Sequence, residues 1–369
     1  MAVRLEVVDE GFVSRREPGT STAVAAGPRP AVTERGVVLC SFMVQPALGV
    51  NDFGTMLAAS VDFGHTWSDA RPIWPGRRGR ESIFCSLSRA PDGALFLFGT
   101  TTPIDRPGET FWSEETQGLK ANRLVWATST DDGTWSHPAE IPMGGPEAAE
   151  AAGPMCVTRS GRWLACYCPY PTFDPTQAVD RSRVIVVASD DRGASWQSRV
   201  MLRFDEPDSG AAEAWLVELA DGRLLGESWH MDIRTGRDFP DAYAISHDGG
   251  DTWAATRSTG IEGQAGSLAA LPDGRVAFAY NQRVREPAGV RVAVAQPGGD
   301  DFGVLDDELV WRAEAALQSG SSPDHDAWRT FAFGEPALAV LPDGDLLLTF
   351  WCVQPSGQGI RFVRLRLGG

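Results

Sequence analysis

The chain has 369 residues, 43% of them hydrophobic and 22% charged, which is typical of a soluble globular protein with a large core and excludes a disordered chain. Acidic residues outnumber basic ones by 49 to 33, and because the resulting net charge of -16 repels polyanions, we expect no nucleic-acid partner. The sequence contains neither a signal-peptide pattern nor an apolar run long enough to span a bilayer, so we expect a cytoplasmic protein without a membrane partner.

The N-terminal segment 3–8 (VRLEVV) has the composition of a β-strand and lies before the first of a series of repeats. The last repeat ends with the apolar strand pattern IRFVRLRL at 360–367 and is one strand short. We therefore predict that the N-terminal strand pairs with the last repeat and supplies its missing outer strand. Such a closure removes the open sheet edges that a linear array would expose.

A short pattern, S-x-D-x-G-x-[ST]-W, recurs along the chain, and this repetition predicts a modular architecture. Full copies occupy 60–67, 189–196 and 246–253, and a copy one residue shorter occupies 129–135. In such a turn Asp and Ser accept hydrogen bonds from amides, Gly provides a positive φ, and Trp packs against the neighbouring repeat. We therefore predict structural roles for the aspartates of the pattern, which are Asp62, Asp131, Asp191 and Asp248.

A second pattern, two apolar runs joined by a turn that contains Gly, is typical of a β-hairpin. Its turns lie at 34–36, 91–93, 159–161, 220–222, 272–274 and 342–344. The two patterns together predict an all-β, six-bladed β-propeller of four-stranded antiparallel blades that forms a single domain over residues 1–369. The fifth blade carries a degenerate sequence at 296–302 in place of the box pattern.

Because strands alternate in direction within a blade, both kinds of turn must share one face of the propeller. The loops between second and third strands then share the opposite face, and the long segments fall there, at 101–122, 169–182, 231–241 and 312–330. Long loops over a rigid scaffold usually carry binding residues. These loops contain aromatic side chains that suit the apolar faces of sugars, including Phe111, Trp112, Tyr170, Phe173 and Trp328.

Two glutamates occupy matching positions in the innermost strands of two blades, each eight residues before the aspartate of the hairpin turn. They are Glu213 in the fourth blade and Glu335 in the sixth, and we expect both to project into one central pocket. Asp52 lies in a loop of the first blade on the same face. Glu81 and Glu150 also precede innermost strands, and we expect them at the rim or mouth of the core.

The six cysteines lack the C-x-x-C pairs and the histidine neighbours that are typical of zinc sites. Cys166 and Cys168 flank Tyr167 in a predicted strand, so both point to one face and are expected to pack in the core. We therefore expect reduced thiols, no metal site and no cofactor.

The box patterns and the six hairpins cover nearly the whole chain and resemble the sialidase superfamily, whose six-bladed propellers carry this pattern as the Asp-box or BNR repeat. In that family a tyrosine nucleophile in the sixth blade is assisted by a glutamate from the fourth, and an aspartate from the first acts as acid/base. The resemblance places these two carboxylates at Glu213 and Asp52. The tyrosine position is occupied by Glu335, which implies a different nucleophile.

The three arginines that bind the substrate carboxylate in that family are also changed. The first falls on Arg29 in the sequence Pro-Arg-Pro, the second falls near Trp229 or His230, and the third lies at Arg283 or a nearby arginine. Trp or His cannot replace a bidentate guanidinium without losing most of the affinity for a carboxylate. Sialic acid is therefore not the expected substrate.

We hypothesise an exo-acting glycoside hydrolase whose partner is a carbohydrate with a neutral terminal sugar. Glu335 would act as nucleophile or base, and Glu213 or Asp52 as a proton donor whose pKa is raised by burial beside another carboxylate. The residues expected to bind substrate are Arg29, Arg80, Trp112, Trp229, His230, Tyr280 and Arg283.

Three alternatives stay open. A uronate-directed lyase or epimerase would use His230 and Tyr280 for proton transfer, with Arg29, Arg80 and Arg283 available to bind the carboxylate. A non-catalytic propeller would bind a glycan or a protein on the loop face. A sialidase with a rearranged carboxylate clamp is the third alternative.

Overall fold

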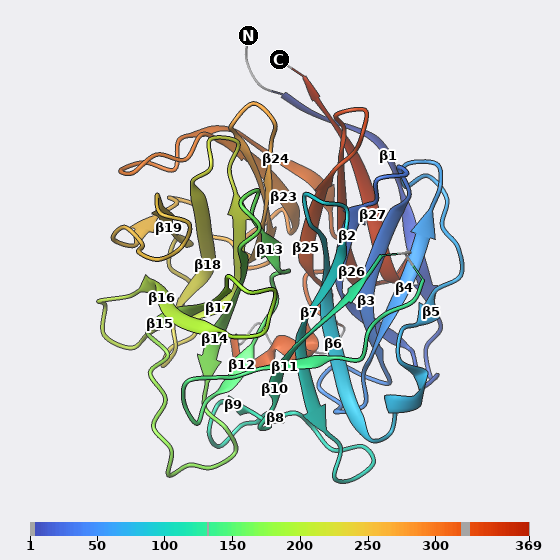
Figure 1. Cartoon of the computed structure of the whole chain (residues 1–369). Helices are drawn as coiled ribbons and strands as arrows, with labels where there is room; N and C mark the ends of the chain where they lie inside the picture. The colour runs from blue at the N-terminus through green and yellow to red at the C-terminus, as the bar shows by residue number, and fades with distance from the viewer. Residues whose placement is uncertain (1–3, 131–132, 319–324, 369) are drawn as a thin grey trace.

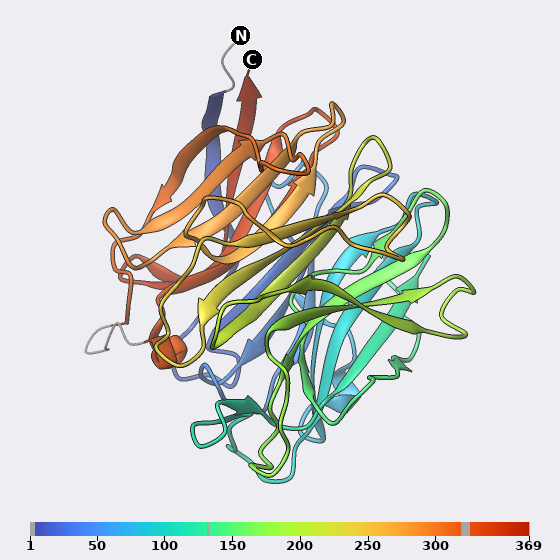
Figure 2. The ribbon, with the colours of Figure 1, turned by 90° about the vertical axis from the view of Figure 1, so that its left-hand side faces the viewer.

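Six antiparallel sheets stand around a central axis and form a closed ring (Figures 1 and 2). The structure is a computed structural model that describes residues 4–130, 133–318 and 325–368. Within these residues each sheet has four strands in antiparallel order, except that the innermost strand of the third is split in two. The predicted six-bladed β-propeller is confirmed.

The blades follow one another along the chain, each from its innermost to its outermost strand. Blade one contains β2 (Val24–Val32), β3 (Val38–Gln45), β4 (Gly54–Ser60) and β5 (Arg71–Pro72). Blade two contains β6 (Glu81–Arg89), β7 (Leu95–Pro103), β10 (Arg123–Ser129) and β11 (Ala139–Ile141). Blade three contains β12 (Ala148–Glu150) with β13 (Cys156–Val157), then β14 (Trp163–Tyr170), β15 (Arg183–Ser189) and β16 (Gln197–Arg203). Blade four contains β17 (Ser209–Glu218), β18 (Leu224–Asp232), β19 (Ala242–Ser246) and β20 (Arg257–Ser258). Blade five contains β21 (Gln264–Ala270), β22 (Val276–Gln282), β23 (Gly289–Ala295) and β24 (Val304–Arg312). Blade six contains β25 (Phe333–Val340), β26 (Leu346–Gln354), β27 (Gly357–Gly368) and β1 (Arg4–Arg16).

The N-terminal strand closes the ring, as the sequence predicted. β1 pairs antiparallel with β27, from Arg4 opposite Gly368 to Arg16 opposite Gln358, and so forms the outer strand of blade six. The two ends of the described chain lie side by side in Figure 1. A chain that enters and leaves through one sheet holds the ring together with backbone hydrogen bonds, because opening it would break this ladder.

The box turns are held by the hydrogen bonds that their sequence predicts. At Asp248 the carboxylate accepts bonds from the Thr252 amide at 2.9 Å and the Thr252 hydroxyl at 2.6 Å, and Ser246 accepts from the Gly250 amide at 2.9 Å. The turns at Asp62 and Asp191 repeat this arrangement. These three predicted structural roles are confirmed, whereas Asp131 lies outside the described residues.

Replacing Asp248 with alanine is expected to lower the melting temperature by about 2 °C, because the turn loses its hydrogen-bond acceptor. The bonds from Thr252 lower the pKa of Asp248 to about 2. A depressed pKa contributes stability above the unfolded value near 4 and loses it as pH falls through 2, so the difference between wild type and variant should shrink from pH 4 to pH 2. Calorimetry across this range measures it. Asp300→Ala, in the degenerate turn of blade five, is the control and should melt like the wild type.

The loop face, opposite the turns, contains short connecting elements. These are a small hairpin of β8 (Trp112–Ser113) and β9 (Gly118–Leu119) and the 3-10 helices η1 (Pro75–Arg77) and η2 (His325–Thr330). No helix in the described ranges is long and apolar enough to cross a membrane. All six cysteines are free thiols, and Cys166 and Cys168 are buried in the packing between blades three and four, as expected.

Candidate active site

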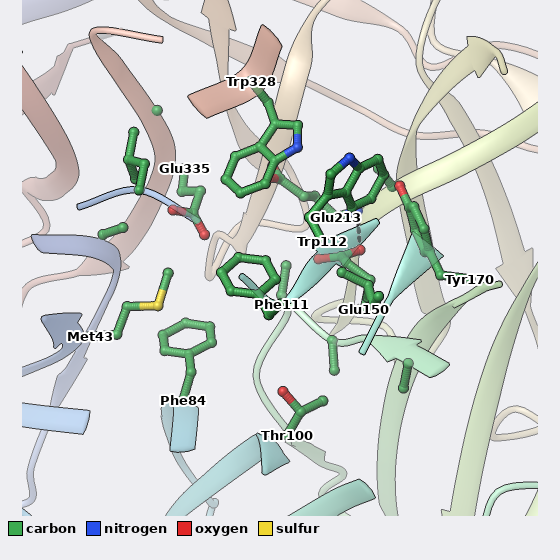
Figure 3. A pocket seen from close by; sticks show the side chains of 18 of the residues that line it. Met43, Phe84, Thr100, Phe111, Trp112, Glu150, Tyr170, Glu213, Trp328 and Glu335 are labelled. Carbon is green, nitrogen blue, oxygen red and sulfur yellow. Dashed lines mark hydrogen bonds between the residues drawn. The ribbon is translucent and has the colours of Figure 1, made fainter. Parts of the chain in front are cut away.

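A pocket of about 260 Å³ opens on the loop face near the propeller axis, with walls built from all six blades and their loops. Its lining is largely aromatic and aliphatic, interrupted by three carboxylates, Glu150, Glu213 and Glu335 (Figure 3). Glu335 lies on one side of the pocket, and Glu150 and Glu213 lie together on the other. A concave apolar site with a few convergent ionisable groups is the usual form of a small-molecule site.

A β-bulge recurs in the innermost strands and aims two of the glutamates at the axis. The register shifts in β2, β17, β21 and β25, and in each case the first extra residue has a left-handed backbone. That residue is Gly27, Glu213, Ala265 or Glu335, with φ between 48° and 61°. Non-glycine residues rarely adopt this conformation, and bulges beside active sites often redirect a side chain. The matching register of Glu213 and Glu335 in the sequence therefore corresponds to matching backbone geometry.

Glu335 is held by groups that favour its negative charge. One carboxylate oxygen, Oε2, accepts a hydrogen bond from the Gly27 amide at 2.9 Å, and the other lies 3.9 Å from the Arg29 guanidinium. Gly27 is the bulge residue of the next blade, and a side chain there would collide with the ring of Phe84. The Glu335 side chain is 17% exposed, so it faces the pocket while remaining anchored.

Glu150 and Glu213 form a second, adjacent pair of carboxyl groups. The Oε2 atom of Glu150 accepts a hydrogen bond from the Glu213 amide at 2.6 Å. The carboxyl of Glu213 has no hydrogen bond or ion pair with the described protein groups and faces the pocket. Burial, with the charges of Glu335 and Glu150, raises its pKa well above the usual range. Burial also raises the pKa of Glu150 to about 7, although the bond from the Glu213 amide opposes this shift.

Three arginines surround these carboxylates, but they differ in what they can reach. Arg29 is only 2% exposed, and its guanidinium donates to the carbonyl oxygens of Ala152 at 2.9 Å and Pro28 at 2.8 Å. Arg29 therefore lies beneath the pocket rather than in it. Arg283 and Arg181 do line the pocket, each stacked on an aromatic ring at about 4 Å, Phe331 and Tyr170 respectively. Burial lowers the pKa of Arg283 to about 10, so it remains charged at neutral pH.

Aromatic side chains from separate loops form a continuous wall at the mouth. Phe111 stacks on Trp328 with ring centres 5.5 Å apart, and Trp112 meets Trp328 edge to face at 6.1 Å. Trp112 also contacts Tyr170 at 6.2 Å. In the other wall, Trp229 donates its indole N–H to Asp238 at 2.9 Å, which orients the ring. Such rings can pack against the apolar faces of a sugar.

The structure brings together five of the ten residues predicted to be catalytic or to bind substrate. Glu213, Glu335, Trp112, Trp229 and Arg283 all line the pocket. Trp112 lies on a long loop and Trp229 lies near the end of β18. Both positions are on the loop face, where we predicted the binding residues.

The other predicted site residues lie elsewhere. Asp52 and Arg80 are absent from the described lining, and the Asp52 carboxylate lies 3.7 Å from Arg78 instead. His230 points away from the pocket because its neighbours in β18, Trp229 and Met231, point into it. Its ring stacks on Phe204 at 4.2 Å, in the packing beside blade three.

Tyr280 is also placed away from the pocket, fully buried between blades four and five. Its hydroxyl donates to Asp307 on the outer strand at 2.8 Å. The expectation that His230 and Tyr280 face the substrate is therefore not met by their positions, since strand alternation turns both rings toward neighbouring blades.

Glu150 was expected only at the rim or mouth, yet it lines the pocket beside Glu213. Its innermost strand is broken between β12 and β13, where Gly153 and Pro154 occur, so no regular register could be counted from the hairpin turn. Glu81 remains outside the described lining, and its carboxylate bonds to Arg77 and Thr101, both at 2.5 Å. Glu150 differs from Glu81 in its place along the sequence, because its blade directly precedes the blade of Glu213.

Comparisons with known structures agree with this architecture. A protein of unknown function from Dyadobacter fermentans superposes with a TM-score of 0.78 at 19% identity, covering 99% of each chain. The intramolecular trans-sialidase of Ruminococcus gnavus superposes with a TM-score of 0.62 at 15% identity, covering 95% of this chain and 96% of that one. The α-L-arabinanase of Penicillium chrysogenum, complexed with arabinobiose, gives 0.60 at 15% identity, covering 97% and 98%. At these identities the likeness shows the fold.

Sequence comparison identifies the family. No curated protein matches the chain. Residues 49–346, however, match the model of the BNR repeat-like domain, and this range contains all four copies of the box pattern. The chain therefore belongs to the BNR repeat-like domain family, and its six-bladed propeller has the fold of the trans-sialidase on which it superposes.

Proposed function

We propose that this protein is an exo-acting glycoside hydrolase that removes a neutral terminal sugar, with Glu335 as nucleophile or base and Glu213 as proton donor. The proposal rests on one observation: two carboxylates at matching positions of one pocket have different hydrogen-bond and ion-pair partners. Glu335 is bound by an amide and lies near a guanidinium, whereas the Glu213 carboxyl has neither in the described structure. Two carboxyl groups in environments that separate their protonation states are what glycoside hydrolysis requires.

The proton is assigned to Glu213 because burial and the neighbouring carboxylates raise its pKa well above the usual range. A carboxylic acid that stays protonated near neutral pH can donate to the leaving-group oxygen. Glu335 is assigned the other role, because its Oε2 already accepts the Gly27 amide and its Oε1 lies near the Arg29 guanidinium. In the reaction, Glu335 would attack the anomeric carbon or activate a water, while the C–O bond breaks and the Glu213 proton passes to the departing oxygen.

The lining supports a sugar as the bound group. Trp112, Trp229 and Trp328 offer rings for stacking, and Thr100 and Gln45 offer polar contacts for hydroxyl groups. The wall formed by Phe111 and Trp328 supports a terminal sugar that enters from one side, hence exo action. Arg29 is occupied by two carbonyl oxygens, so it does not offer a free bidentate grip for a sialic acid carboxylate.

One observation favours a second candidate, an enzyme directed at a uronic acid. Arg283 and Arg181 line the pocket without an ion pair to any described carboxylate within 4 Å. A substrate carboxylate could bind one of them. The predicted proton-transfer residues of that reading, His230 and Tyr280, do not line the pocket, and for this reason the neutral-sugar hydrolase remains our proposal.

Hydrolysis of a panel of aryl glycosides tests the proposal. The panel contains neutral pyranosides and furanosides in both anomeric forms, a glucuronide and a sialoside, and we expect release from one neutral sugar. Release from the sialoside alone would show that the arginine clamp is rearranged rather than lost. Cleavage of a uronate polymer with formation of an unsaturated product would establish the lyase, and silence on every substrate would favour a non-catalytic binding propeller.

A further inference from the structure

The proposed reaction uses two carboxylates, but a third, Glu150, lies in the same pocket (Figure 3). We propose that Glu150 is a positioning residue that fixes the orientation of Glu213 and keeps the catalytic proton on it. The catalytic meaning of this role rests on the proposed function, whereas the interaction between the two carboxyl groups does not.

The positioning is carried by the backbone. Glu213 has a φ of 51°, and its amide donates to Oε2 of Glu150 at 2.6 Å. Loss of this acceptor would leave the amide of a left-handed residue without its partner, so the bulge that aims the Glu213 side chain would relax. The same device occurs across the ring, where Glu335 accepts from the amide of the bulge residue Gly27 at 2.9 Å. In both cases a pocket carboxylate secures the bulge of the next blade.

The control of the proton follows from the unequal hydrogen bonding of the pair. Glu150 accepts an amide bond that favours its ionised form, whereas the Glu213 carboxyl has no such bond in the described structure. When the pair holds one proton, that proton therefore resides on Glu213. The other charged groups that act on Glu213 are Glu335, which opposes ionisation, and Arg283 and Arg29, which favour it.

The negative charge of Glu150 also shapes the step after proton transfer. Once Glu213 has given its proton to the leaving-group oxygen, two carboxylates lie side by side in a buried site, and their repulsion favours return of a proton to Glu213. If Glu335 is the nucleophile, this proton comes from the water that hydrolyses the glycosyl-enzyme intermediate. If Glu335 is the base, Glu335 takes the proton of the attacking water, and solvent exchange then removes that proton from Glu335 and returns one to Glu213. Glu150 itself forms no bond to the substrate in this scheme.

Glu150→Gln tests the proposal, because glutamine keeps an oxygen that can accept the Glu213 amide but removes the charge. We expect the pKa of Glu213 to fall by about one unit in this variant. Carboxyl carbon NMR measures it without any substrate, with the resonance assigned by its loss in Glu213→Gln. The alkaline limb of kcat/KM should move to lower pH by the same amount. Glu150→Ala should lower kcat further, because it also removes the acceptor.

Glu81→Gln is the matched control, since Glu81 also lies in an innermost strand but outside the described pocket lining, and it should leave the Glu213 resonance unchanged. An unaltered pKa of Glu213 in Glu150→Gln would overturn the role of Glu150 in keeping the proton on Glu213, and a Glu150→Ala variant with the kcat of Glu150→Gln would overturn the positioning role. If Glu150→Gln instead loses activity only on substrates with poor leaving groups, Glu150 is itself the acid and the proposal is wrong. A shifted pKa in a protein that hydrolyses nothing would support the coupling and reject the proposed function.

Discussion

Glu335→Gln is expected to reduce kcat/KM on the glycoside identified by the panel by on the order of 10⁴-fold. The amide is close in size to the carboxylate, so it can still occupy the space between Gly27 and Arg29. It cannot attack an anomeric carbon or take a proton from water, and it carries no charge to stabilise an oxocarbenium-like transition state. The loss should appear in kcat for every leaving group, because the group that is removed acts at the sugar and not at the departing oxygen.

The anomeric configuration of the first wild-type product, followed by proton NMR, separates the two roles that remain for Glu335. A nucleophile gives net retention through a glycosyl-enzyme intermediate, and a base gives net inversion by direct attack of water. Glu114→Gln, on the rim beside Arg329, is the control and should keep nearly full activity. Activity within tenfold of the wild type in Glu335→Gln would exclude this residue from the chemistry.

The fold could be predicted from the sequence because it depends on short-range turn chemistry repeated along the chain. The box pattern specifies its own hydrogen bonds, so the turns at Asp62, Asp191 and Asp248 form as a local consequence of Ser, Asp and Gly at fixed spacing. Ring closure could be predicted by counting strands. The last blade was one strand short and the N-terminal strand had no partner in its own region of the chain, so the two were expected to pair. β1 and β27 form that pair.

The residues of the candidate site could be predicted only where they occupy equivalent positions in repeated blades. Glu213 and Glu335 could be matched because each lies at a constant distance before a hairpin turn, and the bulge that gives both a left-handed backbone keeps this distance. Glu150 lies in an innermost strand that is broken between β12 and β13, so the same count fails there. Asp52 lies in a loop, whose path depends on contacts such as the one with Arg78 that no local pattern encodes.

The sequence also could not show which of two adjacent residues in a strand faces the pocket. Trp229 and His230 are adjacent at the end of β18, and only one of them can face the pocket. The choice depends on the bulge in the partner strand β17, which shifts the register between Ala212 and Trp215. A one-residue shift of register exchanges the two faces of a strand, so a sequence pattern that does not reveal the bulge cannot assign them.

Glu213→Gln should lose activity in proportion to how much the leaving group needs a proton. We expect kcat/KM to fall by about 10³-fold on an alkyl glycoside and by no more than about tenfold on a dinitrophenyl glycoside, whose phenolate departs without protonation. The wild-type rate should fall as pH rises through the pKa of Glu213, because only the protonated form donates, and burial beside two carboxylates moves this limb to higher pH than an ordinary glutamate gives. In the variant the limb should vanish.

The leaving-group series distinguishes the acid from the other two carboxylates of the pocket, since each predicts a different pattern. Loss of Glu335 lowers all rates together, loss of the Glu150 charge moves the pH limb, and loss of Glu213 alone makes the rate depend steeply on the leaving group. An equal loss on alkyl and dinitrophenyl substrates in Glu213→Gln would reject the proton-donor assignment. The acid would then have to be Glu150, because its pKa of about 7 makes it the one other carboxyl in the described lining with a resolved upward shift.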